Sequence, residues 1–247
     1  MLLLRFVVLG LAAVIACFEA HAAAPGESIG SAVAVKNEVT AAFAGESRRL
    51  QKDDPVKQDE IIEVGADGLG ELQFKDNTKL ALGPGARMTL DKFVYDPAKS
   101  NGSIVVNLIK GTFRFITGVA AKPAYVIKTP TASISVRGTV FDICIRPNGG
   151  TWVLLIEGSV KMCSVTGSCR TLNEPGKVMR VTLDKKVQAA ASWPDLPGKD
   201  QTALETAFPF VPLAPSFAPA PALSRDQILD GRLPSAKHKK KRTKSHP

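Results

Sequence analysis

Histidine is scarce in this chain of 247 residues, and its placement limits the chemistry of the middle of the chain. The three histidines are His21, His238 and His246, so residues 32–185, which we predict below to fold, contain none. A Ser-His-Asp or Cys-His nucleophile needs an imidazole base, and imidazole is the commonest metal ligand. The sequence therefore indicates no catalytic residue, no metal site and no cofactor, and we expect a protein that is not an enzyme.

Carboxylates are the acid–base groups that remain in this region. Glycoside hydrolysis uses two carboxyl groups at a set separation, which a sequence does not measure. Most of these residues lie on strand faces or in turns, as Asp67 and Asp76 do, where short polar side chains bond the local backbone. A carboxylate-based, glycan-active enzyme therefore stays as the lesser alternative. Its candidates are Glu63, Asp67, Glu71, Asp76, Asp142 and Glu157.

Long apolar runs are lacking after the N-terminus, where none approaches the roughly 20 residues that cross a membrane. At the N-terminus, Arg5 precedes an apolar stretch, and small residues at Ala20 and Ala22 follow it. This pattern predicts a secretory signal peptide at residues 1–22, cleaved before Ala23, and a periplasmic or secreted protein. The alternative is a bacterial lipobox at residues 14–17, which predicts a lipoprotein lipidated at Cys17.

Cysteines are few, and removal of the signal peptide leaves Cys144, Cys163 and Cys169. The last two flank a short turn that contains Gly167, and in an oxidising compartment such a pair is expected to form a disulfide worth roughly 2 kcal/mol. Cys144 alternates with isoleucines in a predicted strand, so we expect a small buried hydrophobe. Because the number of cysteines is odd, a Cys144–Cys163 bridge is the alternative.

Aromatic residues make up only 6 % of the chain, whereas turn formers are frequent, with 20 glycines and 17 prolines. Between residues 32 and 185, turn signals recur about every 8 to 12 residues, and no segment shows sustained helical periodicity. This pattern predicts an all-β fold, either β-solenoid-like or a twisted double sheet. Within it, Asp76-Asn77 is the expected turn of a hairpin, and Lys110-Gly111 is expected to divide two strands.

The C-terminal part differs in composition from the rest. Residues 194–236 are rich in proline and alanine, which predicts a disordered, polyproline-type linker. Residues 237–247 form a polybasic tail that holds six cations of a chain whose net charge is +9. Lys237 to Lys244 are expected either to contact an anionic envelope surface or to act as a solvated terminus, and no nucleic acid partner is expected.

A set of motifs in the middle of the chain resembles the FecR-type domain, which is named after a ferric-citrate regulator of bacterial cell-surface signalling. That family has a TP-x-A-x-x-x-V-R-G-T-x-F signature followed by an E-G-x-V turn. Residues 74–84 and 111–115 fit further motifs of the family, with Asn77 and Thr78 in place of the usual glycine and serine. The likeness is closest over residues 60–165 and looser from 32 to 185. The matching signature residues are Thr129, Pro130, Ala132, Val136, Arg137, Gly138, Thr139, Phe141, Glu157, Gly158 and Val160.

The resemblance implies a β-helical or twisted double-sheet domain that senses or binds a partner. We interpret its motif residues as structural: Gly138 and Gly158 supply bends, while Arg137 and Thr139 satisfy nearby backbone groups. The family's regulators carry a cytoplasmic segment and a spanning helix before the domain, where this chain has an export signal. Control of a sigma factor is therefore not carried over.

The sequence thus favours a stand-alone, exported, non-catalytic module that binds or senses an envelope protein or a glycan. The second hypothesis is a structural or surface-attached envelope protein that is retained by its basic tail.

Overall fold

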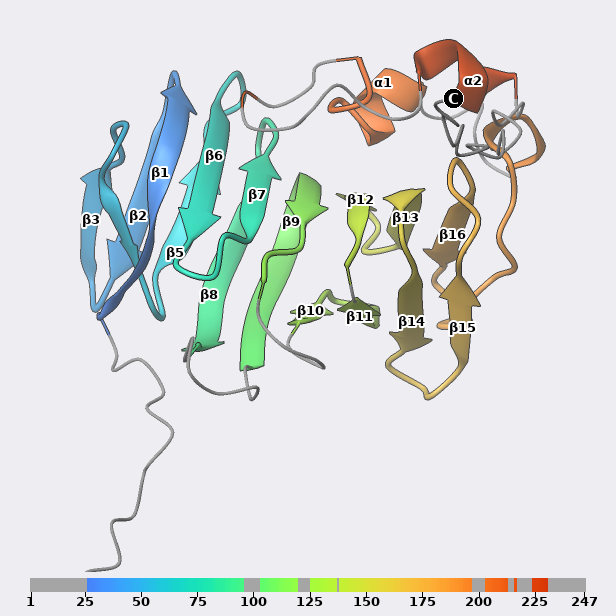
Figure 1. The fold of residues 1–247 in the computed structure, drawn as a ribbon, viewed down its shortest axis with the longest axis horizontal. Helices are drawn as coiled ribbons and strands as arrows, with labels where there is room; N and C mark the ends of the chain where they lie inside the picture. Colours follow the sequence, from blue (N-terminus) through green and yellow to red (C-terminus); the bar gives the residue numbers. More distant parts are fainter. Residues whose placement is uncertain are drawn as a thin grey trace, which may run out of the picture.

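Strands dominate the computed structural model of the chain, which describes residues 26–95, 103–119, 125–136, 138–196, 203–212, 216 and 224–230. Helices in these residues are short and occur after the last strand (Figure 1). The strands are β1 (Ser28–Lys36), β2 (Val39–Phe43), β3 (Glu46–Arg49), β4 (Pro55–Lys57), β5 (Ile61–Val64), β6 (Leu69–Phe74), β7 (Lys79–Leu82), β8 (Arg87–Val94), β9 (Ser103–Ile116), β10 (Tyr125–Lys128), β11 (Ala132–Val136), β12 (Val140–Ile145), β13 (Thr151–Glu157), β14 (Val160–Ser164), β15 (Cys169–Leu172) and β16 (Val178–Val181). The helices are the 3-10 helix η1 (Trp193–Asp195), α1 (Leu204–Ala207) and α2 (Arg225–Leu229). The expected all-β fold is confirmed.

The strands form one connected mixed sheet that folds into two layers. Layer A has the order β4-β1-β6-β7-β9-β12-β13-β16, and layer B has the order β3-β2-β5-β8-β9-β10-β11-β14-β15. The chain moves between the layers after every one or two strands. The β9–β10 pairing is parallel, and the other strand pairings among the described residues are antiparallel.

Strand β9 belongs to both layers. Its first half pairs with β8 and β10 in layer B, and residues from Gly111 to Ile116 pair with β7 and β12 in layer A. Gly111 has φ +98° and lies so close to Ala86 that a Cβ atom would approach the Ala86 Cα to 2.5 Å. The prediction of two strands divided at Lys110-Gly111 was therefore wrong, because glycine at positive φ bends the strand without ending it.

The main core lies between the layers. Leu72, Leu82 and Phe113 from layer A join Ile62 and Met88 from layer B in one buried cluster. The alternation of buried and exposed residues along β6 is that of a strand with one face on a core. The expected hairpin is confirmed as β6–β7, in which Leu72 pairs with Leu80 and Asn77 takes φ +65° in the turn.

A second apolar cluster covers the outer face of layer A over β12, β13 and β16. Trp152, Leu154 and Val178 point outward from the strands and are buried under Trp193 and Phe208. Strands β12 and β13 are therefore buried on both faces, and their sequences read as almost unbroken apolar runs. The outer cluster also contains Cys144, Ile156, Leu196, Leu204, Ala207, Val211 and Ile228.

We call the described residues 193–196, 203–212 and 224–230 the cover. Nearly all of them fall within residues 194–236, the range in which we predicted a disordered linker. The described parts of that range instead include α1 and α2, and Leu204 and Phe208 are 2 % and 0 % exposed. Ser224 caps α2 through a capping box with Gln227. The prediction of disorder was wrong for these segments, because a few apolar side chains among many prolines are enough to pack on an apolar sheet face. The predicted signal peptide, Cys17 and the polybasic tail lie outside the described residues.

Candidate functional site

The TP motif closes the turn between β10 and β11. The Ala132 backbone N–H donates to Thr129 Oγ1 at 3.0 Å, and Thr129 Oγ1 lies 2.7 Å from Thr151 Oγ1. Thr131 Oγ1 lies 2.8 Å from the same Thr151 hydroxyl. Since Thr151 begins β13 in layer A, these hydroxyl groups join the two layers. Pro130 is exposed in the turn.

The G-T and E-G motifs meet where β11, β12 and β14 come together. Thr139 N donates to Thr117 Oγ1 at 2.8 Å, and Thr139 Oγ1 donates to the Ser159 carbonyl at 2.9 Å. Gly158 has φ +87°, and a Cβ atom there would lie 2.3 Å from the Gly138 carbonyl oxygen. Only glycine fits this approach without displacing the backbone.

The remaining signature residues are split between core and surface. Phe141 is fully buried and packs on Phe115, with ring centroids 5.5 Å apart. Glu157 is exposed at the end of β13, and Gly138 takes φ +59°. Arg137 lies outside the described residues. Thr129, Thr139, Phe141 and Gly158 thus hold turns and core together, which is the arrangement that a structural role requires.

Asp76 organises a buried polar network that sequence reasoning found only in part. Its Oδ2 accepts hydrogen bonds from Thr78 Oγ1 at 2.7 Å and from the Tyr125 hydroxyl at 2.6 Å. Its Oδ1 accepts from the Thr78 backbone N–H at 3.1 Å. The turn of the β6–β7 hairpin is thereby fixed to β10 in the other layer. Tyr125 was not foreseen as a partner because 49 residues separate it from Asp76.

Arg114 and Asp142 form a buried ion pair that the sequence did not reveal. Arg114 Nε donates to Asp142 Oδ1 at 2.6 Å, and Nη2 donates to Oδ2 at 2.8 Å. Both residues are 1 % exposed, and the guanidinium lies 6.0 Å from the ring centroid of Phe210 in the cover. Burial raises the pKa of Asp142, and the charge and hydrogen bonds of Arg114 oppose that rise. Both carboxylate oxygens are occupied, so the pair is arranged for structure.

Three of the other carboxylates named above also have polar partners. Glu63 pairs with Arg87 at 3.0 Å, Asp67 accepts from Asn37, and Glu71 accepts from Ser216. Within the described ranges, no three His, Cys, Asp or Glu side chains gather closely enough to hold a metal ion. No described helix has the length and apolar character needed to cross a membrane.

The cysteines follow the first of the two predicted arrangements. Cys163 and Cys169 form a disulfide across the paired strands β14 and β15. Cys144 is free and buried in the outer cluster under the cover. Burial raises the pKa of its thiol to about 11, although the nearby Arg146 acts in the opposite direction. Cys144 is thus a small buried hydrophobe, as predicted.

A small pocket of about 130 Å³ lies at the N-terminal end of the two layers. Arg48 crosses between the layers there, donating to Glu60 Oε1 at 2.8 Å and to the Pro55 carbonyl at 2.6 Å. Glu60 is 2 % exposed, and its second oxygen accepts from the Lys57 backbone N–H. The Arg48 and Glu60 charges therefore close this end of the core. The pocket is lined by Ala41, Phe43, Glu46, Ser47, Arg48, Lys57 and Glu60.

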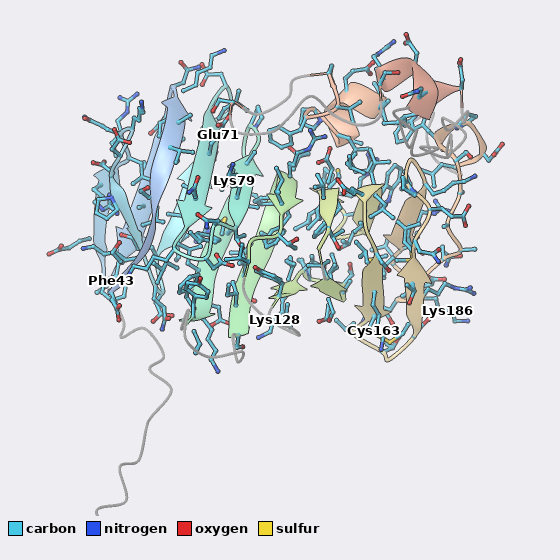
Figure 2. The ribbon with its side chains drawn as sticks, in the orientation of Figure 1. Phe43, Glu71, Lys79, Lys128, Cys163 and Lys186 are labelled. Carbon is cyan, nitrogen blue, oxygen red and sulfur yellow. A yellow bond between two sulfur atoms is a disulfide. The ribbon has the colours of Figure 1, made fainter. Side chains whose placement is uncertain are left out.

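The outer face of layer B differs from that of layer A because no described segment packs on it. We call this surface the open face. Its side chains stand in register across the strands, as in the row Thr89–Asn107–Lys128–Ser133–Cys163, and all are half-exposed or exposed. Figure 2 labels Lys128 and Cys163, which belong to this row. A second row comprises Lys92, Val105, Val126, Ser135 and Lys161.

Comparisons with known proteins bear on the middle of the chain. The family model described as FecR protein matches residues 60–161. No curated protein matches the chain. Two crystal structures of a candidate anti-sigma factor from Parabacteroides distasonis ATCC 8503, at 2.50 and 1.65 Å resolution, are 18 % and 19 % identical to the chain, each with a TM-score of 0.42. Each alignment covers 52 % of this chain and 57 % of that protein, so the chain spans little more than half the length of the structures it matches.

Proposed function

We propose that this chain, which carries a FecR domain, is an exported, non-catalytic module that binds or senses an envelope protein or a glycan. A FecR domain supports a signalling or regulatory role. The observation that carries the proposal is the difference between the two sheet faces. The chain's own C-terminal segment covers layer A over β12, β13 and β16, whereas the open face of layer B presents ordered rows of half-exposed side chains.

Two further observations support the proposal. The Cys163–Cys169 disulfide suits an oxidising compartment, and residues 1–22 have the pattern of a secretory signal peptide. The motif residues Thr129, Thr139 and Gly158 are engaged in turns and links between strands, which agrees with a structural role for the motif in a non-catalytic module.

Site-specific crosslinking tests the open face. A photoreactive amino acid is placed at Ser135, which is exposed on β11, and in a matched variant at Asp195, which is exposed in the cover. We expect one stoichiometric partner from envelope extract at physiological salt with the Ser135 probe and none with the Asp195 probe. Equal capture at both positions, or capture at neither, would contradict the proposal.

The second candidate function is attachment to an anionic surface through the basic tail, and the cluster of six cations after residue 236 favours it. If attachment is the function, deletion of residues 237–247 releases the protein from envelope fractions, and salt releases the intact chain. Retention of the truncated chain in envelope fractions would contradict attachment through the tail and would favour the interaction module.

A further inference from the structure

Two turns at the C-terminal end of the two layers expose large apolar side chains. Val165 lies in the turn between β14 and β15 and is 58 % exposed, and Leu183 follows β16 and is 65 % exposed. Only two other large apolar residues in the described parts of the chain are exposed, Ile109 and Val119. We call residues 164–168 and 182–186 together the tip.

Hydrogen bonds hold the two turns of the tip beside each other. Thr166 Oγ1 donates to the Lys185 carbonyl at 2.8 Å, and the Val187 N–H donates to Ser168 Oγ at 3.4 Å. The Cys163–Cys169 disulfide closes the base of the first turn. Figure 2 shows Cys163 and Lys186 at the same end of the molecule. The tip is therefore one fixed surface, although its two halves come from different layers.

The second turn is built around Asp184. Its Oδ1 accepts from the Thr182 hydroxyl and from the Lys186 N–H, and its Oδ2 accepts from Gln188 Nε2. The Thr182 hydroxyl is the main reason that the pKa of Asp184 is lowered, and the Lys186 N–H and the Lys186 charge act in the same direction. Lys185 takes φ +56°, a conformation that side chains other than glycine rarely adopt. The one carboxylate of the tip thus fixes a turn that leaves Leu183 exposed.

Cations surround the exposed apolar side chains. Lys185 and Lys186 are exposed in the second turn, and Arg170 is exposed on the adjoining strand β15, where its Nε donates to the Val187 carbonyl at 2.9 Å. Lys185 has no ion-pair partner among the described residues, whereas Asp184 offsets part of the Lys186 charge. Cations beside exposed aliphatic groups are the composition that binds the boundary between lipid headgroups and acyl chains.

We propose that the tip docks on an anionic phospholipid bilayer. Val165 and Leu183 enter the headgroup boundary, while Lys185, Lys186 and Arg170 contact lipid phosphates. Turns at the end of strands form a projecting surface, which suits a flat bilayer better than the groove that a bound peptide needs. The inference goes beyond the proposed function, because the open face stays available for a partner while the tip holds the domain on a membrane.

Vesicle binding of the oxidised, full chain tests the proposal. Co-sedimentation is measured with vesicles of phosphatidylcholine alone and with vesicles that contain about one-third phosphatidylglycerol, at moderate salt. We expect binding to the anionic vesicles only. The double substitution K185Q/K186Q lowers the partition coefficient about 25-fold, since each lysine near an anionic surface contributes about fivefold. The double substitution V165S/L183S lowers it about tenfold or more.

Matched variants separate the tip from other apolar and basic groups. V119S removes a side chain that is 67 % exposed outside the tip, and it leaves binding unchanged. The triple substitution K239Q/K240Q/K241Q measures the contribution of the tail in a chain whose tip is intact. Reduction of the Cys163–Cys169 disulfide weakens binding a few-fold, because the first turn is then held less firmly.

The proposal is overturned if V165S/L183S binds the anionic vesicles as tightly as the unaltered chain. It is also overturned if the tail substitution alone abolishes binding. A third contrary result is the absence of vesicle binding together with capture of one protein by a crosslinker at Val165, because the tip is then a protein contact.

Discussion

At the scale of single residues, the buried Arg114–Asp142 ion pair is the feature of the fold that we expect to tolerate substitution least. Two charges that are 1 % exposed keep each other in place through two hydrogen bonds, at 2.6 and 2.8 Å. A buried pair adds little stability compared with apolar groups of the same size, but removal of one partner leaves a buried charge without compensation. The pair therefore makes each of its members hard to replace alone.

The substitution R114M is expected to lower the free energy of unfolding by about 3–5 kcal/mol at neutral pH. The matched control is R87M, which breaks the half-exposed Arg87–Glu63 pair and costs under about 1 kcal/mol. Denaturant unfolding of both variants checks the difference. Equal losses of unfolding free energy in the two variants would show that breaking the buried pair costs no more than breaking the half-exposed pair.

The free energy of unfolding of R114M is also expected to depend on pH. Burial already raises the pKa of Asp142, and loss of the Arg114 charge raises it further. At pH values above the ordinary pKa of an aspartate, the Asp142 carboxyl group of R114M binds fewer protons in the unfolded state than in the folded state. The free energy of unfolding therefore falls as pH rises from the ordinary pKa to the raised one. We expect the deficit of R114M to be smaller at acidic pH than at neutral pH. Unfolding curves of R114M and R114M/D142N across this range check the sign, since the double variant loses the dependence.

Cys144 gives a second prediction at this scale. A buried thiol whose pKa is about 11 is almost entirely protonated near pH 8, and the thiolate is the reactive form. In the oxidised protein Cys144 is expected to resist a thiol reagent until denaturant is added, and then to react fully. Mass spectrometry measures the labelled fraction. Rapid labelling of the folded chain would mean that the cover over Cys144 opens readily.

At the scale of elements, the G-T and E-G motifs depend on one close backbone contact. The substitution G158A places a methyl group 2.3 Å from the Gly138 carbonyl at φ +87°, so we expect a loss of about 2–4 kcal/mol. G149A is the control, since Gly149 also has positive φ, at +83°, but nothing lies within 4 Å of its added Cβ. It is expected to cost about 1 kcal/mol. Thermal unfolding of the two variants separates the clash from the backbone strain.

Local patterns predicted the elements well where the turn chemistry is local. Among the turn signals of the sequence, Thr129-Pro130, Asn148-Gly149-Gly150 and Gly158 lie between strands, and Asp76-Asn77 turns a hairpin. Residues that act through partners far along the chain were not foreseen. Arg114 meets Asp142 because β9 and β12 are neighbours, and no pattern within either strand encodes that pairing.

At the scale of the whole molecule, the C-terminal cover changes what counts as the domain. The FecR match ends at residue 161, yet Phe208 and Ile228 are buried in the outer cluster, which lies over β12 and β13. A signal for this cover was present in the sequence, because Trp152, Leu154 and Ile156 make the second face of a strand apolar, and such a face must be buried. The alanines and prolines after residue 194 favoured a disordered linker, whereas Leu204 and Phe208, which are four residues apart, are buried anchors of the cover.

The cover can be followed by fluorescence, because Trp152 and Trp193 are the only tryptophans of the chain and both lie in the outer cluster. The substitution F208A removes a ring that lies 6.1 Å from Trp193 between centroids. We expect tryptophan emission to move to longer wavelength while the β-sheet circular dichroism persists. The control F93A, in the main core, lowers stability by about 3–5 kcal/mol without moving the native emission. Unchanged emission in F208A would show that the cover does not depend on this anchor.

The double membership of β9 has a mechanical consequence. Among the described residues, every strand pairing that connects β1–β8 with β10–β16 passes through this one strand. If one end of the protein were anchored and the other end pulled by a partner, β9 would carry the tension in the sheet. Its hydrogen bonds to β7, β8, β10 and β12 would resist sliding together, so the two halves would yield under load as one unit.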